Sequence, residues 1–396
     1  MVAAGTIDKQ SRLPVVLALG TTQTIAWASS YYLPAILADP MARDLGVSPT
    51  WVFGAVSVSL ILSALIGPKV GRTIDILGGR GVLALSNIVF AAGLCVLCIA
   101  HTKAVLALGW LAMGAGMGLG LYDSAFATLG RLYNTEARRS ITGITLMAGF
   151  ASTIGWPLTA WGAETFGWRE TCLGWAAVHL FFALPLNLLG IPQASRIQQT
   201  VERHAKPHIP MDKDMWLLAF AFACGWIVST GMAAHLPRII EGMGATTAQA
   251  IGASALVGPA QVFARLVETS LLARYHPLIS ARLSTVAHPI GAILTLIASG
   301  GAVFGLFASF HGAGNGILTI ARGTVPLAVF GPENYGYRLG LIGAPARLAQ
   351  AAAPLLFGIL IDRLGSGVLF VSSGLCLAAL LALLFVKATH ALEEIN

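Results

Sequence analysis

The chain has 396 residues, of which 56% are hydrophobic and 10% charged, whereas soluble globular domains carry roughly 25% charged residues. This composition excludes an ordinary water-soluble fold and indicates a chain whose solvent is the lipid bilayer. The formal net charge of +7 does not indicate nucleic-acid binding, because the basic residues are spread over loops and form no basic face with interleaved aromatic residues.

Hydropathy predicts twelve membrane-spanning helices in chain order, since each crossing needs about 20 mostly apolar residues. All five cysteines fall in apolar stretches, so we expect neither a disulfide framework nor a metal site, and no cofactor. The predicted spans cover residues 14–37, 50–68, 81–101, 104–130, 140–163, 169–191, 214–236, 248–273, 281–300, 303–329, 337–361 and 366–387.

The distribution of basic residues predicts the orientation of the chain. With the N-terminus inside, seventeen of the 24 Lys and Arg residues lie in or beside cytoplasmic segments and five in external ones. The positive-inside rule therefore favours a multi-pass protein of the inner membrane with both termini in the cytoplasm. We expect a monomer.

A polar loop near the middle of the chain divides the predicted spans into six and six. The expected organisation is an N-terminal half over 1–192, a cytoplasmic loop over 193–213 and a C-terminal half over 214–396. Gly71-Arg72-x-x-Asp75 returns as Ala264-Arg265-x-x-Glu268, 193 residues later, and Trp156-Pro157-Leu158 is echoed by Ala353-Pro354-Leu355. Such parallel halves are a known transporter architecture, with the substrate site between them.

The segment between spans 2 and 3 carries a more specific motif, Gly71-x-x-x-Asp75-x-x-Gly78-Gly79-Arg80. It resembles the signature loop of the major facilitator superfamily, although Ile76 stands where that family usually has a basic residue. The resemblance implies the all-α fold of that family, with twelve transmembrane helices in two pseudo-symmetric halves. It also implies a conformational latch at Gly71, Arg72, Asp75, Gly79 and Arg80, in which Asp75 faces a helix N-terminus or an arginine. The repeat extends a gating role to Arg265 and Glu268.

A looser resemblance concerns a branch of that superfamily, the monocarboxylate and oxalate/formate transporters. That branch would imply a small organic anion as substrate. The motifs that carry this resemblance are Gly114, Gly116, Gly118 and Gly120 before Tyr122, Arg138-Arg139, Gly155-Trp156-Pro157 and Gly167-Trp168-Arg169.

Three charged residues fall inside predicted spans: Asp123 in span 4, Arg322 in span 10 and Arg347 in span 11. A charge at this depth costs at least about 2.5 to 3.5 kcal/mol, so it faces a cavity or a partner. Because a guanidinium binds a carboxylate through two parallel hydrogen bonds, we expect Arg322 or Arg347 to hold an anionic substrate. Asp123 is the candidate for proton coupling, since a poorly hydrated carboxyl group takes up a proton more readily than in water. Alternatively, Asp123 forms a structural ion pair with one arginine.

Further polar residues fall in spans that line the cavity of the family. Gln23, Trp27 and Tyr31 recur at helical spacing in span 1 and form one face, which either lines the cavity or anchors the helix at the interface. His235 at the end of span 7 and Asn315 in span 10 are secondary candidates for substrate contact.

These features predict a secondary transporter that works by alternating access. Import of a small organic anion with protons is our first hypothesis, and export of drugs or metabolites by proton antiport is the alternative. No convergent catalytic set is visible, so we do not expect an enzyme.

Overall fold

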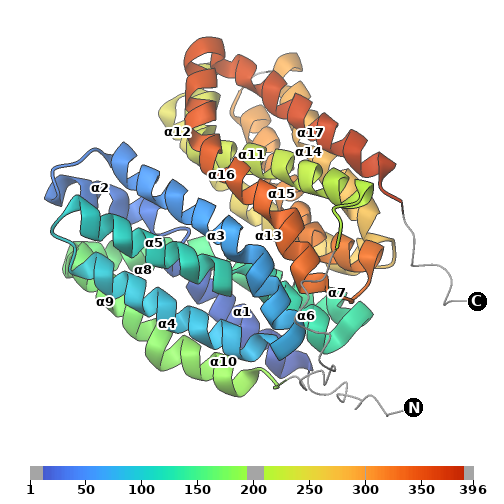
Figure 1. Ribbon diagram of the computed structural model, residues 1–396. Helices are drawn as coiled ribbons and strands as arrows, with labels where there is room; N and C mark the ends of the chain where they lie inside the picture. Colours follow the sequence, from blue (N-terminus) through green and yellow to red (C-terminus); the bar gives the residue numbers. More distant parts are fainter. Residues whose placement is uncertain (1–11, 194–208, 299, 388–396) are drawn as a thin grey trace, which may run out of the picture.

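The computed structural model describes residues 12–193, 209–298 and 300–387, and these are helical with no strand among them. Figure 1 shows the helices in chain order. The N-terminal helices are α1 (Arg12–Ser29), α2 (Pro34–Asp44), α3 (Pro49–Leu77), α4 (Gly79–Cys98), α5 (Lys103–Gly120), α6 (Tyr122–Tyr133), α7 (Ala137–Ala148), α8 (Ala151–Thr165), α9 (Trp168–Val178) and α10 (Leu184–Gly190). The C-terminal helices are α11 (Lys213–Gly242), α12 (Thr247–Ala255), α13 (Val257–Val267), α14 (Pro277–Ile297), α15 (Gly301–Phe330), α16 (Tyr335–Leu364) and α17 (Val368–Phe385).

The helices account for twelve membrane crossings. Seven crossings are single helices, while the other five are divided by a short break or a π-helical turn, as in α5 and α6 or α12 and α13. Within the described ranges, eight helical segments are long and apolar enough to span a bilayer by length and composition alone. The broken first, fifth and eighth crossings are not among the eight, and the segment Leu356–Phe385 joins the end of α16 to α17. The predicted all-α membrane fold is therefore confirmed.

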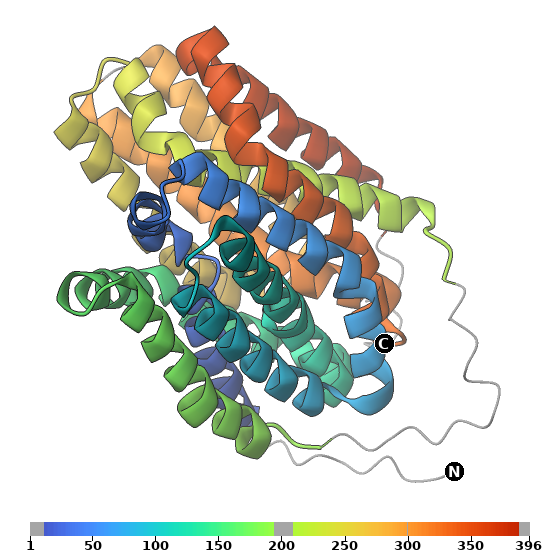
Figure 2. The ribbon, with the colours of Figure 1, turned by 60° about the vertical axis from the view of Figure 1, so that its left-hand side comes forward.

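Helices α1 to α10 and helices α11 to α17 gather in two bundles that lie side by side (Figures 1 and 2). The largest apolar core fills the first bundle, and two smaller cores fill the second. Tyr335 and Leu339 of α16 belong to the core of the first bundle. The bundles thus share packing at the start of α16.

Helix α3 and helix α16 form the closest backbone contact between the two bundles. A Cβ atom on Gly71 would overlap the carbonyl oxygen of Gly336, and a Cβ atom on Gly340 would overlap the backbone of Gly67. Small residues let helix backbones approach in a membrane because no side chain separates them. These four glycines therefore set the distance between the bundles.

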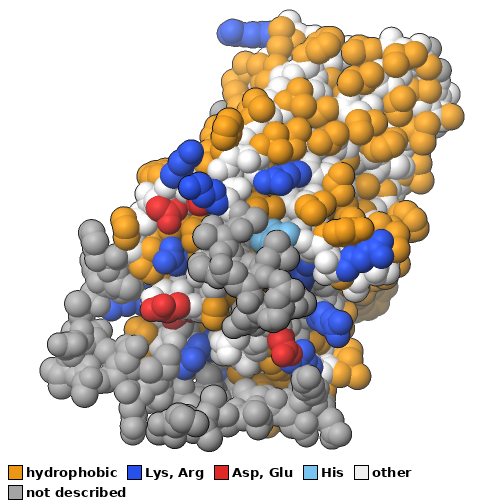
Figure 3. Space-filling view, turned by 90° about the vertical axis from the view of Figure 1, so that its right-hand side faces the viewer, with side chains coloured by type: hydrophobic (Ala, Val, Ile, Leu, Met, Phe, Trp, Pro, Cys, Tyr) orange, Lys and Arg blue, Asp and Glu red, His pale blue; other side chains and the backbone are white. Residues whose placement is uncertain are grey.

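One end of the molecule gathers the first residues of α1, α7, α11 and α16 and the last residues of α3 and α17. We call it the terminal end, because the first described residues of α1 and the last residues of α17 lie there (Figure 1). Arg12 forms an ion pair with Glu136, and Lys213 lies over the ring of Phe385. Figure 3 shows this end, with Lys and Arg side chains spread over it beside a broad apolar flank.

The segment predicted as a loop after span 2 is mostly helical, which corrects the predicted boundary at residue 68. Helix α3 continues to Leu77, and the chain turns only at Gly78, where φ is 82°. A positive φ is readily adopted only by glycine. Gly71, Arg72 and Asp75 thus lie on the last turns of α3, while Gly79 and Arg80 begin α4.

Candidate functional site in a central cavity

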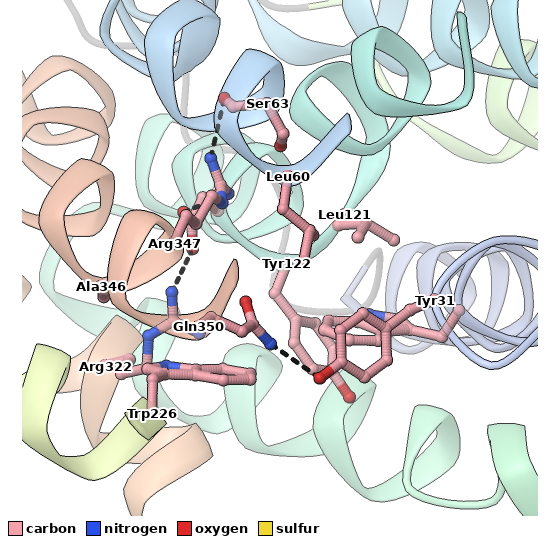
Figure 4. Close-up of a pocket in the computed structure, with 12 residues that line it drawn as sticks. Tyr31, Leu60, Ser63, Leu121, Tyr122, Trp226, Arg322, Ala346, Arg347 and Gln350 are labelled. Carbon is pink, nitrogen blue, oxygen red and sulfur yellow. Dashed lines mark hydrogen bonds and ion pairs between the residues drawn. The ribbon is translucent and has the colours of Figure 1, made fainter. Parts of the chain in front are cut away.

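A small cavity lies between the two bundles, deep in the molecule (Figure 4). Its volume of about 20 Å³ is room for about one water molecule. The space that the two halves leave between them at this point is therefore small. Helices α1, α3, α6, α11, α15 and α16 and the α1–α2 and α5–α6 junctions line the cavity. The lining residues are Trp27, Tyr31, Leu60, Ser63, Leu121, Tyr122, Asp123, Trp226, Arg322, Ala346, Arg347 and Gln350.

The carboxylate of Asp123 lies between two guanidinium groups of the other bundle. Nη2 of Arg347 donates to Oδ2 at 2.5 Å, and Nη2 of Arg322 donates to Oδ1 at 3.3 Å. All three residues are at most 8% exposed. Asp123 therefore pairs with both arginines rather than with one, and two positive charges share a single negative charge.

A break in the fourth crossing places Asp123. The chain leaves the helical conformation at Leu121, so Asp123 lies in the first turn of α6, where the helix dipole favours a negative charge. The break also frees the carbonyl group of Gly120, which accepts a hydrogen bond from Nε2 of Gln23 at 2.6 Å. Ser124 returns a hydrogen bond to the Gly118 carbonyl at 3.1 Å.

Aromatic rings form another side of the cavity. The ring centroids of Trp27 and Tyr122 are 4.8 Å apart, and those of Trp27 and Tyr31 are 5.2 Å apart. From the second bundle, Trp226 lies under the guanidinium of Arg322, with 4.5 Å between Cζ and the ring centroid. Gln350 donates to the Tyr31 hydroxyl at 2.8 Å, a hydrogen bond that joins the bundles (Figure 4).

The comparisons with known proteins decide the family. The family model described as Major Facilitator Superfamily matches residues 19–318. The chain belongs to the major facilitator superfamily. It is accordingly a transporter for small molecules and not an enzyme. The resemblance to the monocarboxylate branch stays a prediction.

Two relatives and one solved structure illustrate the range of similar superfamily members. An uncharacterized 38 kDa protein of Thermoproteus tenax is 28% identical over 81% of this chain and 87% of its own length. The purine ribonucleoside efflux pump NepI of Shigella sonnei is 25% identical over 35% of each chain. The crystal structure of the human organic anion transporter MFSD10 (TETRAN) matches with a TM-score of 0.73 at 17% identity, covering 95% of this chain and all 100% of that one. At this identity the structural likeness shows the fold alone.

Not all predicted binding residues of this superfamily member meet in the cavity. Asp123, Arg322, Arg347, Trp27 and Tyr31 line it. Gln23 is buried beside it and bonded to the broken helix. His235 packs near Gly358 on the outer part of α11. Asn315 lines a second small cavity inside the C-terminal bundle, where it accepts a hydrogen bond from Ser229 at 2.8 Å.

Sequence reasoning missed Trp226, Tyr122 and Gln350 as lining residues. Gln350 follows Arg347 by three residues and therefore shares its helix face, a signal that could have found it. Trp226 carries no such signal, because a tryptophan in an apolar span resembles ordinary packing.

The second cavity also contains a pair of histidines. Nδ1 of His288 and Nδ1 of His311 are 3.1 Å apart, and Nε2 of His288 lies 2.9 Å from the Ser372 hydroxyl. Both histidines are buried. The side chain of His288 points into the C-terminal bundle. Among the residues that the structure describes, no three His, Cys, Asp or Glu side chains gather as a metal site.

At the terminal end, the side chain of Asp75 on α3 contacts the start of α16 in the other bundle. Its carboxylate accepts the backbone N–H groups of Gly336 and Tyr337, each at 2.9 Å. The helix N-terminus is thus the partner of Asp75 here. A carboxylate at this position compensates both the free N–H groups and the helix dipole. Gly79 packs against Thr128.

A second contact between the two bundles lies at the start of α7 and involves the repeated motif. Nη2 of Arg138 donates to the buried Glu268 at 2.8 Å, and Nη1 donates to the carbonyl oxygens of Ala273 and Tyr275 at 3.0 and 2.6 Å. Arg265 reaches the Thr145 carbonyl at 2.9 Å. Arg138, which sequence reasoning had used only for orientation and family resemblance, is therefore the cross-bundle partner of Glu268.

Proposed function

We propose that this transporter moves a small organic anion together with a proton. One observation carries the proposal: the central cavity holds two guanidinium groups and one carboxylate. The lining residues therefore have an excess of one positive charge. A buried charge is tolerated when it is paired, and a substrate carboxylate supplies the missing partner.

Protonation of Asp123 links the anion to the proton in this proposal. The anion competes with Asp123 for Arg347. The planar guanidinium group of an arginine can bind a carboxylate through two parallel hydrogen bonds. A neutral Asp123 releases both arginines, and the site then accepts one anion for each proton taken up. The substrate carboxylate is held by Arg322 and Arg347. The walls around the substrate are formed by Trp27, Tyr31 and Gln350.

We also propose that the halves 1–192 and 214–396 are the moving bodies of alternating access, joined by the loop 193–213. The Asp75 contact with α16 and the Arg138–Glu268 pair keep the terminal end closed. Arg72, Arg80 and Arg265 belong to the same end, although the hydrogen bonds of Asp75 go to backbone groups rather than to these arginines. Much of the central loop lies outside the described residues.

The terminal end faces the cytoplasm in this proposal, and the protein works as a monomer in the inner membrane. The basic surface of that end supports this orientation (Figure 3). Reporter proteins fused to either terminus should be active only in the cytoplasm. A reporter active on the external side would overturn the orientation.

The transport proposal is tested with purified protein and with proteoliposomes. We expect carboxylates to raise the melting temperature and cationic or neutral compounds to leave it unchanged. Arg347→Gln and Arg322→Gln should each weaken anion binding about 10- to 100-fold, since a hydrogen bond to a charged group contributes about 1.5 to 3 kcal/mol. Arg238→Gln is the matched control, because Arg238 pairs with Asp362 on an exposed surface. Stabilisation only by cationic or neutral compounds would sink the proposal.

Export of a metabolite by proton antiport is the second candidate, and the partial match to a purine ribonucleoside efflux pump favours it. The direction of transport separates the two. In proteoliposomes, a proton gradient drives the substrate in the same direction as protons for symport and in the opposite direction for antiport.

A further inference from the structure

We propose that the anion carried by this protein is an aromatic carboxylate, whose ring lies between Trp226 and an aromatic wall made of Trp27, Tyr31 and Tyr122. This inference rests on the proposed function and names its substrate class. It specifies the part of the substrate other than the carboxylate. The two arginines bind only the carboxylate and do not select that part.

The aromatic wall presents rings from α1, the α1–α2 junction and α6 at one side of the cavity. Trp27 lies at the centre of the cluster, 4.8 Å from the ring centroid of Tyr122 and 5.2 Å from that of Tyr31. The interplanar angles of 45° and 71° leave the rings tilted rather than stacked flat against one another. Tilted and edge-on contacts are favourable for aromatic groups, so a further ring can continue the cluster.

Trp226 supplies an aromatic surface from the opposite bundle. It packs against the core of the N-terminal bundle, and Arg322 lies over its ring at 4.5 Å. A guanidinium so placed also attracts the face of an additional ring. An aromatic acid thereby contacts both bundles: its carboxylate binds the arginines and its ring contacts Trp226 and the aromatic wall.

The cavity is narrow, which favours a flat substrate. Its volume of about 20 Å³ is too small for a ring in the conformation described. The Gln350–Tyr31 hydrogen bond lies between the arginines and the aromatic wall and joins the two bundles (Figure 4). Separation of these two side chains opens a slot between Trp226 and Tyr31, and a planar ring needs the smallest separation.

The buried indole N–H groups of Trp27 and Trp226 favour a flat ligand with hydrogen-bond acceptors rather than a purely aliphatic ligand. Nε1 of Trp27 and Nε1 of Trp226 are buried, and no described residue supplies them with a hydrogen-bond acceptor. An unmade hydrogen bond at a buried donor costs free energy. A ligand with oxygen atoms or an electron-rich ring supplies acceptors for these groups, whereas a saturated hydrocarbon chain does not.

The test uses the purified full-length protein and four probes at neutral pH: benzoate, cyclohexanecarboxylate, acetate and benzyl alcohol. We expect benzoate to raise the melting temperature at about tenfold lower concentration than cyclohexanecarboxylate, since contacts between aromatic rings are favourable beyond the area that they bury. Acetate should bind more weakly than either. Equal binding of benzoate and cyclohexanecarboxylate, or tighter binding of acetate, overturns the aromatic inference and leaves the anion proposal intact.

Benzyl alcohol separates the two proposals, because it carries the ring without the charge. If it binds as tightly as benzoate, the anion proposal fails while the aromatic wall stands. If none of the four probes binds, both proposals fail.

Variants test whether the aromatic side chains of the cavity cause the preference for benzoate over cyclohexanecarboxylate. Trp226→Leu should remove the tenfold preference for benzoate yet keep binding of cyclohexanecarboxylate, whereas Arg347→Gln should weaken both. Trp216→Leu is the matched control, because Trp216 lies on the same helix and is 58% exposed. A preference that survives in Trp226→Leu and also in Trp27→Leu overturns the assignment.

Discussion

Asp123 combines three influences that act on a single carboxylate. The start of α6 supports its negative charge through the helix dipole, two guanidinium groups neutralise it, and burial disfavours any charge left without a partner. Removal of one member of such a buried group typically costs about 3 to 5 kcal/mol. The charge state of Asp123 and the occupancy of the arginines are therefore coupled.

Replacement of Asp123 by Asn mimics the protonated side chain. In Asp123→Asn, uptake driven by a pH gradient should be lost, because the side chain at position 123 can no longer take up a proton. Uptake in proteoliposomes with and without a pH gradient checks this expectation. Undiminished gradient-driven uptake in the variant would exclude Asp123 from coupling.

The charged residues of the cavity could be predicted from the sequence, and some neutral ones could not. Asp123, Arg322 and Arg347 stand out because a charge in hydrocarbon requires a partner. Gln23 was expected to share a face with Trp27 and Tyr31. The break at Leu121 exposes the Gly120 carbonyl, however, and this group binds the amide of Gln23. No pattern in span 1 reveals a break in span 4.

At the scale of helices, α3 shows how hydropathy and helix length differ. The apolar stretch ends near residue 68, but α3 continues to Leu77. Hydropathy marks the part of a helix that lies in hydrocarbon, whereas Gly78 marks where the helix ends. The predicted crossings were correct and this boundary was wrong, because a polar turn of helix can extend beyond the bilayer.

The contact between α3 and α16 depends on the absence of side chains. We expect Gly71→Ala to separate these helices at the terminal end, since the new Cβ atom overlaps the Gly336 carbonyl. Overpacking of this kind typically costs about 1 to 3 kcal/mol, and thermal unfolding measures it. Gly81→Ala is the control, because nothing lies within 4 Å of a Cβ atom there. Equal stability of the two variants would contradict the close contact.

His276, at the start of α14, should make the stability of the fold depend on pH. Its Nδ1 accepts the N–H of Leu278 at 3.2 Å, and burial, followed by the charges of Arg138 and Arg282, lowers the pKa of His276 below 6.5. Because the folded state disfavours the proton, stability that is present above pH 6.5 should decrease as pH falls. His276→Asn should reduce this loss, while His101→Asn, at an exposed site, should not. Melting temperatures from pH 7.5 to 5 test this.

At the scale of the whole molecule, two related contacts join the bundles at the terminal end. Asp75 binds the start of α16, and Glu268, its counterpart in the repeat, binds Arg138 at the start of α7. The repeat in the sequence thus predicted that both acids belong to equivalent positions. It did not predict the partners, because the two halves have diverged at the helix starts.

Each of these two contacts should favour the conformation that is closed at the terminal end. We expect Asp75→Ala and Glu268→Gln to increase the population open at this end, and the double variant to increase it further, since distant sites add. The distance between spin labels at Leu77 and Glu333, with the native cysteines replaced, measures the population. Asp362→Asn is the acidic control, since Asp362 forms an exposed pair with Arg238. An unchanged distance distribution in all variants would refute the gating role.

The shared ion pair also bears on how the unloaded protein resets. An empty site with two bare guanidinium groups would have to carry uncompensated charge through the closed state, which is costly in a low dielectric. Asp123 already neutralises one of these charges when no ligand is present. Under the proposed mechanism, the empty site therefore carries one uncompensated positive charge instead of two, and we expect the unloaded protein to reorient without cargo and to carry out net uptake as well as one-for-one exchange.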